Sequence, residues 1–252
     1  LDPGTGYKKL YVQAGNVRNR GVEMTLGFHK KFGEFDYNSS LTATANRNKI
    51  IKLASGVTNP ISGQVFDLTD IRKGRFRLRE GGELGDVYAS ERIKRDANGY
   101  VEYTQGQSLV TEPTEPYKLG SVNAKWNFGW KHGFSYKGFD LNVLFTARLG
   151  GIVISKTQAA LDKFGVSQAS ADARDAGGVT IGQGLNIDPQ KYYDAIYNLD
   201  SYYVYSATNV RLQELSLSYS LPKSLFGKVF KNVGVSVYAT NLWMIYNKAP
   251  FD

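Results

Sequence analysis

Apolar and polar residues alternate along six stretches of the chain, and this alternation constrains the fold more than any other feature. In the clearest stretch, apolar residues occupy every second position from Phe139 to Leu149, with Asp140, Asn142 and Arg148 among the residues between them. A period of two places successive side chains on opposite faces of a β-strand. The sequence therefore predicts an all-β, antiparallel fold with strands near residues 18–29, 35–46, 124–136, 139–149, 209–221 and 233–243.

The predicted strands are long, since the alternating runs cover roughly 8–13 residues each. Strands of soluble sheets are commonly about 5–6 residues long, whereas a tilted strand needs about 9–11 residues to cross a bilayer. No run approaches the ~18 apolar residues that a transmembrane helix requires. Alternation by itself fits two classes of protein, a membrane β-barrel and a soluble β-sandwich, because the strands of both have one apolar and one polar face.

The connections between the predicted strands differ sharply in length. Short turns are predicted at residues 30–34, 137–138 and 222–232, and long loops at residues 47–123 and 150–208. Outer-membrane barrels have this asymmetry, with short periplasmic turns and long extracellular loops. Aromatic residues such as Phe35, Tyr136 and Phe139 flank the short turns, as they do where a membrane meets water. Loop lengths and aromatic positions together favour the barrel.

Six strands are too few to close a barrel on their own. The smallest single-chain barrels need about 8 strands, and an unpaired strand edge in lipid leaves backbone groups without hydrogen bonds. We therefore expect the remaining strands to come from a longer chain or from partner chains. The absence of an initiator methionine and of a signal segment at Leu1-Asp2-Pro3 fits the expectation of a piece of a longer protein.

Several segments resemble motifs of one family of outer-membrane receptors. Residues Asn16 to Glu23 (NVRNRGVE) resemble the N-x-x-N-[KR]-G-V-E strand opening of TonB-dependent receptors. Residues Tyr117 to Gly129, followed by Phe134 to Leu141 (FSYKGFDL), are similar to a hairpin of the SusC/RagA branch, although Ala124 replaces the proline expected there.

Further matches lie on both sides of that hairpin. Residues Glu80 to Tyr88 and Lys94 to Gly99 look like two loop motifs of the same branch, with Glu83 where a proline is usual. Residues Asn209 to Pro222 and Val235 to Leu242 match its late strands. Because the matches follow the family's order over nearly the whole chain, the chain resembles the C-terminal part of a SusC-like barrel, cut before the final strand.

The resemblance implies a fold, a location and a set of partners. The expected fold is a barrel of about 22 strands, with residues 1–252 inside one barrel domain and residues 47–123 and 150–208 as extracellular loops. The expected location is the bacterial outer membrane, crossed many times, in contact with lipid and lipopolysaccharide. The family imports oligosaccharides or oligopeptides with energy delivered by TonB. An N-terminal plug domain fills the barrel, and a SusD-like lipoprotein forms a lid over it.

The candidate ligand-binding residues are polar positions on or near the barrel wall, close to the long loops. They are Tyr117, Asn123, Lys125, Arg148 and Arg211. Arg148 and Arg211 near Tyr117, Tyr202, Tyr203 and Tyr205 at the mouth suit stacking and hydrogen bonding with sugar or peptide. A polar wall also suits hydrated substrates, because solutes that lose water need replacement hydrogen bonds.

Other chemistries have little support in the sequence. The chain has no cysteine and only two histidines, His29 and His132, so we predict no enzyme activity, no metal site and no cofactor. The net charge of +8 comes without a nucleic-acid-binding motif, and we expect no nucleic-acid partner. The run from Arg72 to Arg79 alternates basic and apolar residues, which predicts a cationic strand face that is either solvated or binds an acidic partner or phosphate-bearing lipid.

Two alternatives remain open from the sequence. One is a structural or accessory barrel inside a larger outer-membrane complex, without transport. The other is a soluble surface β-sandwich that binds carbohydrate, which requires Trp126, Phe128, Val143 and Phe145 to pack in a closed core.

Overall fold

The computed structural model describes residues 15–58, 62–104, 106, 108–182, 185–225, 230 and 232–251. The chain divides into two compact units. The sheet unit comprises Arg18–Asn48, Asn123–Gly151 and Ser206–Asp252, and the loop unit comprises Lys49–Val122 and Ile152–Tyr205 with the chain up to Val17. No helix among the described residues is long and apolar enough to cross a membrane.

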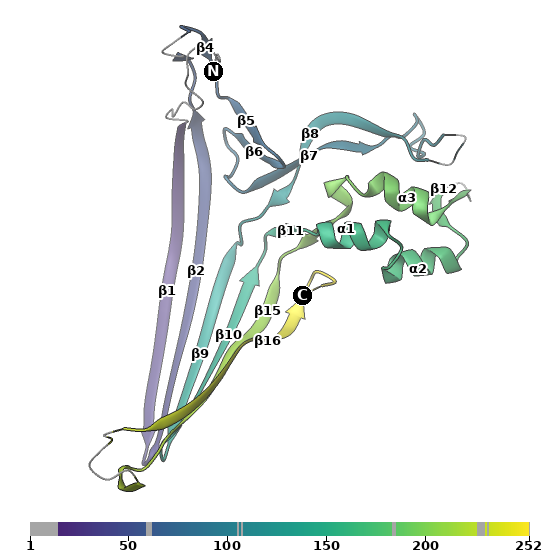
Figure 1. Ribbon diagram of the computed structural model, residues 1–252. Coiled ribbons are helices and arrows are strands. Elements are labelled where there is room, and N and C mark those ends of the chain that lie inside the picture. The colour runs from purple at the N-terminus through teal and green to yellow at the C-terminus, as the bar shows by residue number, and fades with distance from the viewer. Residues whose placement is uncertain are drawn as a thin grey trace. The chain divides into compact units, whose positions relative to one another are not determined.

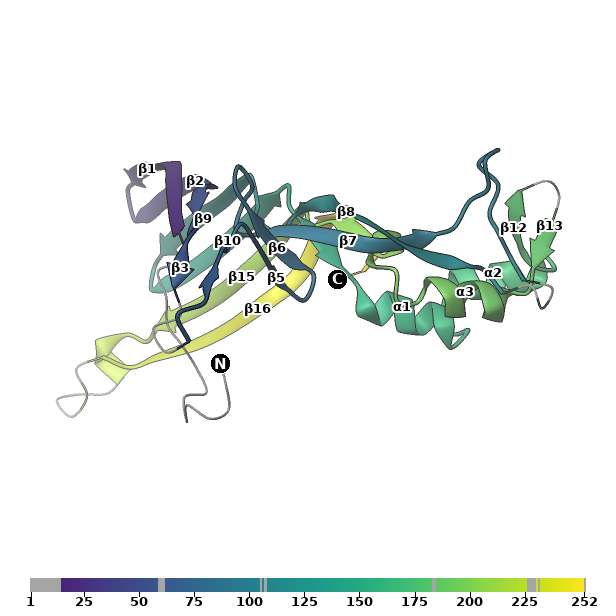
Figure 2. The same ribbon diagram turned by 90° about the horizontal axis from the view of Figure 1, so that it is seen from above.

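The long strands form one antiparallel sheet of six strands (Figure 1). Its strands are β1 (Gly15–Phe32), β2 (Phe35–Leu53), β9 (Trp126–Tyr136), β10 (Phe139–Leu149), β15 (Asn209–Ser220) and β16 (Gly234–Asn247). They follow one another in the order β1-β2-β9-β10-β15-β16, which Figure 2 shows from above. Within the described residues the sheet is open, with β1 and β16 at its two edges.

The turns at one end of the sheet are tight. Lys137 and Gly138 join β9 to β10 and have φ angles of 47° and 85°, the pair of positive values that a type I′ hairpin turn requires. The turn between β1 and β2 consists of Gly33 and Glu34, with Gly33 at a φ of 63°. It is therefore shorter than the predicted turn at residues 30–34, because β1 continues to Phe32, while β2 begins at Phe35 as predicted. The connection at 222–232 contains the 3₁₀ turn η3 (Lys223–Leu225), and residues 226–229 and 231 lie outside the described residues.

The register separates the two kinds of side chain onto two faces. Residues directly opposite one another across strands point to the same face. One such row is Leu41, Trp130, Phe145, Leu212 and Trp243, and a second is Tyr37, Phe134, Leu141, Leu217 and Val237. The intervening rows are polar, for example Asp36, Ser135, Asp140, Ser218 and Ser236. The sheet therefore has one apolar face and one polar face across five of its strands.

The apolar face is open and not packed into a core. Val22 is 60% exposed, Val237 is 70% exposed and Trp243 is 62% exposed. Trp126, which a soluble sandwich would need to bury, is 38% exposed. An exposed apolar face of this extent suits contact with lipid and contradicts the sandwich alternative.

Polar atoms on the apolar face are paired with each other. The Tyr37 hydroxyl lies 2.8 Å from His132 Nδ1, and the Trp130 Nε1–H donates to Ser39 Oγ at 3.1 Å. Polar groups in a hydrocarbon environment need partners within the protein because no water is present to replace them. The pairing therefore lets these side chains occupy a lipid-facing position.

The two long loops contain regular structure of their own. The first holds β3 (Val57–Thr58), β4 (Val65–Phe66), β5 (Asp70–Lys73), β6 (Phe76–Arg79), β7 (Asp86–Ile93) and β8 (Thr111–Ser121). The second holds β11 (Ile152–Ile154), α1 (Lys156–Lys163), α2 (Gln168–Asp175), β12 (Val179–Gly182), β13 (Leu185–Ile187), α3 (Pro189–Ile196), η2 (Asp200–Tyr202) and β14 (Val204–Ser206). Strands β5-β6-β7-β8 form a separate four-stranded sheet.

Both long loops contribute to one hydrophobic core, which makes them a single unit. The first loop supplies Ile93 and Leu109, and the second supplies Ala159, Ile187, Tyr193, Ile196, Leu199 and Tyr203. Tyr203 is only 2% exposed. Each helix begins at a side-chain cap, such as the Ser155 Oγ that accepts the N–H of Gln158 at 3.0 Å. These short helices are therefore stabilised by their caps and by burial of their apolar faces.

Strand β2 runs beyond the alternating residues that predicted it. The alternation ends near residue 46, but β2 continues to Leu53. The N–H of Ile50 donates to the carbonyl of Gly82 at 2.9 Å, and the N–H of Gly81 donates to the carbonyl of Ile50 at 2.8 Å. Ile50 and Leu53 are buried. The extension thus depends on pairing with residues about 30 positions away, which no local pattern reveals.

Candidate functional site

Three of the five candidate residues lie on or beside the polar face of the sheet, near the ends of β9, β10 and β15. Arg148 on β10 is paired with Asn127 on one side and Asn209 on the other, and Arg211 is paired with Thr146. These positions are adjacent polar rows of the same face. Lys125 lies next to them, because its N–H donates to the carbonyl of Leu149 at 2.8 Å. Arg148, Arg211 and Lys125 thus gather at one end of the sheet.

The base of the second long loop is fixed beside these residues. The N–H of Gly150 donates to Thr208 Oγ1 at 2.9 Å, and the N–H of Ala207 donates to the carbonyl of Gly151 at 3.0 Å. Gly150 has a φ of 79°, and a Cβ atom built there would lie 3.0 Å from Lys125 Cγ. The Lys125 side chain therefore packs over a position that favours glycine. Asn123, the fourth candidate in this unit, is half-buried in the bend before β9.

Tyr117, the fifth candidate, belongs to the loop unit. It lies on β8 opposite Ala89, and its hydroxyl donates to the carbonyl of Glu91 at 3.4 Å. It lines a cavity of about 460 Å³, which we call the Arg95 cavity. The cavity is lined by Arg92, Ile93, Arg95, Asp96, Tyr117, Ser201 and Tyr202. Tyr202 therefore accompanies Tyr117, as the sequence suggested, but the arginines beside them are Arg92 and Arg95.

The expectation that Tyr203 and Tyr205 lie where they can contact a ligand was wrong for Tyr203. Tyr203 is buried in the core of the loop unit, and Tyr205 packs against that core. Burial raises the pKa of Tyr203, and the negative charge of the Asp162 carboxylate raises the pKa further. The Tyr203 hydroxyl therefore stays protonated and serves the structure of the unit instead of facing a ligand.

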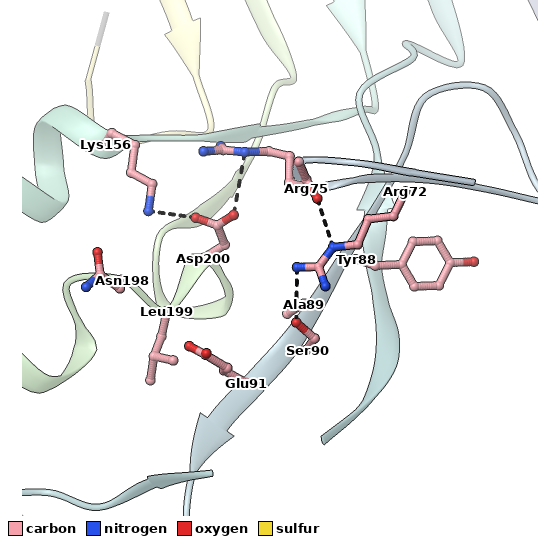
Figure 3. Close-up of a pocket in the computed structure, with 11 residues that line it drawn as sticks. Arg72, Arg75, Tyr88, Ala89, Ser90, Glu91, Lys156, Asn198, Leu199 and Asp200 are labelled. Atoms are coloured by element: carbon pink, nitrogen blue, oxygen red, sulfur yellow. Dashed lines mark hydrogen bonds and ion pairs between the residues drawn. The ribbon is translucent and has the colours of Figure 1, made fainter. Parts of the chain in front are cut away.

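A second cavity of about 340 Å³ adjoins the Arg95 cavity, since the consecutive residues Asp200 and Ser201 line one cavity each. We call it the Asp200 cavity (Figure 3). Asp200 lies between two cations, with Oδ1 2.8 Å from Lys156 Nζ and Oδ2 3.5 Å from Arg75 Nε. Arg75 belongs to the first long loop and Lys156 and Asp200 to the second. Asp200 thus joins the two loops by an ion-pair network.

The basic run from Arg72 to Arg79 forms the hairpin of β5 and β6. Arg77 and Arg79 both bind the carboxylate of Asp70, and Arg75 binds Asp200. The hydrogen bond from Arg77 is the main reason that the pKa of Asp70 lies below its usual value. Three of the five cations of this run thus have carboxylate partners within the protein, and binding of an acidic partner or of phosphate-bearing lipid stays a prediction.

A buried carboxylate explains the motif at residues 80–88. Asp86 is 1% exposed, accepts the N–H of Glu83 at 2.9 Å and lies 2.6 Å from Lys118 Nζ. Gly82 packs against it, because a Cβ atom at Gly82 would lie 3.0 Å from Asp86 Oδ2. The motif therefore holds a turn together around one buried charge.

The sequence did not single out Arg92, Arg95 or Asp200 as functional. The only available signal was that Arg95 and Asp96 lie next to the turn-forming residues Ala97-Asn98-Gly99 in a family-like motif. Asp200 and Arg75 are far apart in the chain, so no spacing links them.

Comparison with known proteins agrees with the fold and the motifs. No protein-family model matches the chain. TonB-dependent receptor P3 of Formosa agariphila is 25% identical over 265 aligned positions, which cover 94% of this chain and 25% of the receptor. The chain is thus similar to a TonB-dependent receptor over nearly its whole length.

Two solved structures share the fold of this chain. The structure of the RagAB peptide transporter matches with a TM-score of 0.63 and 21% identity, over 97% of this chain and 27% of the other. The RagAB peptide importer in its "open-open" state matches with a TM-score of 0.58 and 19% identity, over 98% and 27%. The chain spans about a quarter of the length of these proteins.

Proposed function

We propose that the chain forms part of the wall and the loop region of a TonB-dependent importer of polar oligomers. The observation that carries this proposal is the division of the sheet into an apolar and a polar face, row by row across β2, β9, β10, β15 and β16. The apolar face would hold the segment in lipid. The polar face would line a water-filled passage, where side chains replace the hydrogen bonds that a solute gives up.

The substrates in this proposal are oligopeptides or oligosaccharides. Both are polar and flexible, and both need many weak hydrogen bonds instead of one apolar pocket. Arg148, Arg211 and Lys125 at one end of the polar face would provide such bonds along the passage. Tyr117 in the loop unit would contact substrate before it enters. The proposal further includes a SusD-like lipoprotein as a lid and TonB as the source of energy.

The proposal is tested in cells that carry the full-length receptor containing this chain. A deletion strain, complemented with wild-type or variant receptor, is given fluorescent oligopeptides and oligosaccharides, and uptake is measured with and without a protonophore. We expect protonophore-sensitive uptake of one substrate class. We expect R148A and R211A to reduce it severalfold at unchanged receptor level, while R174A, an exposed arginine on α2, leaves uptake unchanged.

Two results would contradict the proposal. If the deletion strain takes up both substrate classes at the wild-type rate, the receptor is not needed for their transport, and a structural barrel is favoured. Uptake unaffected by the protonophore would remove the requirement for TonB.

A further inference from the structure

The Arg95 cavity combines several hydrogen-bond donors with an excess of positive charge. Its charged lining residues are Arg92, Arg95 and Asp96, two cations against one anion. The anion is turned to the backbone, because Asp96 Oδ1 accepts the N–H groups of Asn98 and Tyr100, each at 2.9 Å. Arg92 is ion-paired with Glu112, so the Arg95 guanidinium is the main charge presented to the cavity.

Both arginines are oriented by neighbours that leave most of their donors unused. Arg92 Nε donates to Glu112 Oε1 at 2.8 Å, and Arg95 Nη1 donates to the carbonyl of Gly99 at 2.8 Å. A guanidinium carries five N–H donors, so a single bond of this kind fixes its direction and retains the capacity to bind a ligand. The arrangement is thus organised before any ligand arrives.

Hydroxyl groups add further hydrogen-bond donors to the cavity. Burial raises the pKa of Tyr202, although the Arg95 guanidinium opposes this by lowering it. Tyr202 therefore keeps its proton at neutral pH and can donate it in a hydrogen bond. Ser201 also lines the cavity, whereas the Tyr117 hydroxyl already donates to the carbonyl of Glu91. A group that accepts several hydrogen bonds and carries negative charge is the natural complement of this lining.

We propose that the Arg95 cavity binds a carboxylate group of the substrate, with Arg95 as the principal contact and Arg92 and Tyr202 beside it. A carboxylate fits because its two oxygens match the planar fork of a guanidinium. The volume of about 460 Å³ admits one or two monomers of an oligomer, so the cavity would select acidic units within a chain. The identification of the ligand as a substrate rests on the proposed import function, whereas the binding chemistry does not.

The test measures binding to purified full-length receptor with probes that differ only in charge. Tetraglutamate is compared with tetraglutamine, and tetragalacturonate with its methyl ester, so that the peptide and sugar sources of a carboxylate are distinguished. Calorimetry at low salt is expected to show tighter binding of the acidic member in at least one pair. R95Q is expected to reduce the affinity of that acidic probe about fivefold to tenfold, and 0.5 M salt is expected to weaken the preference in wild type.

The control variant is R174Q, which removes one positive charge from the same unit at a different cavity. It should keep the acidic preference, and R95K should retain part of it because the charge remains while the fork is lost. Equal binding of acidic and neutral probes, or equal effects of R95Q and R174Q, would overturn the proposal. If wild-type receptor binds the acidic probe with this dependence on Arg95 but cells do not import it, the import function fails and the carboxylate site stands.

Discussion

Replacing Val143 by arginine should destabilise the receptor in the membrane much more than replacing its neighbour Asn142 by arginine. The two positions are adjacent on β10 and lie at the same depth. Val143 is on the apolar face, opposite His132 and Leu215, and Asn142 is on the polar face, opposite Gly133 and Ser216. The pair of variants introduces the same side chain on two faces, so the difference between them isolates the effect of lipid.

The depth of Val143 follows from the register. An aromatic row containing Tyr136, Phe139 and Tyr219 lies four residues from Val143 on one side, and the row of Phe128 and Ala147 lies four residues away on the other. Eight residues at about 3.3 Å each, tilted by about 40°, span about 20 Å, close to the ~25 Å apolar band of outer-membrane barrels. Val143 is therefore near the midplane, where arginine on a lipid-facing strand costs about 2–4 kcal/mol.

The assay is equilibrium unfolding of full-length receptor in lipid vesicles, followed by tryptophan fluorescence and by the mobility of the folded form on gels. V143R should lower the free energy of unfolding by about 2–4 kcal/mol, whereas N142R should change it by less than about 1 kcal/mol. Equal destabilisation by the two variants would refute the assignment of the apolar face to lipid.

Three further predictions concern the loop unit. D86N should make the unit more sensitive to protease, at a cost of about 1–3 kcal/mol, because it removes the partner of Lys118; unchanged protection would contradict this. D200A should speed amide exchange in both long loops, since Asp200 binds Arg75 and Lys156; an effect on one loop alone would argue against a shared network. Burial raises the pKa of Tyr192 to about 12, so the unit should be stable below pH 10 and lose stability as the pH rises toward 12. The Y192F variant should lose less stability over this pH range, as measured by unfolding at several pH values.

The strands could be predicted from the sequence because their signal is local. The face of the sheet on which Leu141 lies can be predicted from the polar residues next to it in the sequence, whichever strand it pairs with. The register that joins Leu141 to Phe134 and Leu217 follows from the same faces and from the tight turn at Lys137 and Gly138. Short helices were harder, although Ser155 followed three residues later by Gln158 is a capping-box pattern that could have indicated α1.

The candidate site was harder to predict from the sequence, because its residues meet through tertiary contacts. Tyr117 and Tyr202, which line one cavity, were predicted from the preference of aromatic side chains for ligands, but Arg95 was not predicted, since one arginine in a loop resembles any other. Tyr203 was misassigned because composition cannot distinguish a tyrosine in a core from one in a cavity. Only burial separates them, at 2% exposure for Tyr203 and 39% for Tyr202.

The shared core of the loop unit has a consequence for the order of assembly. Ile93 and Leu109 come before the β9–β10 hairpin in the chain, and Ile187 and Tyr203 come after it. Contacts of such long sequence separation form slowly, because a long segment must close before they stabilise anything. Ile93 and Leu109 therefore lack their partners from the second loop until the hairpin and the second loop have been made. The loop unit should be a late product of biogenesis, and a folding factor that shields Ile93 and Leu109 in the interval would raise its yield.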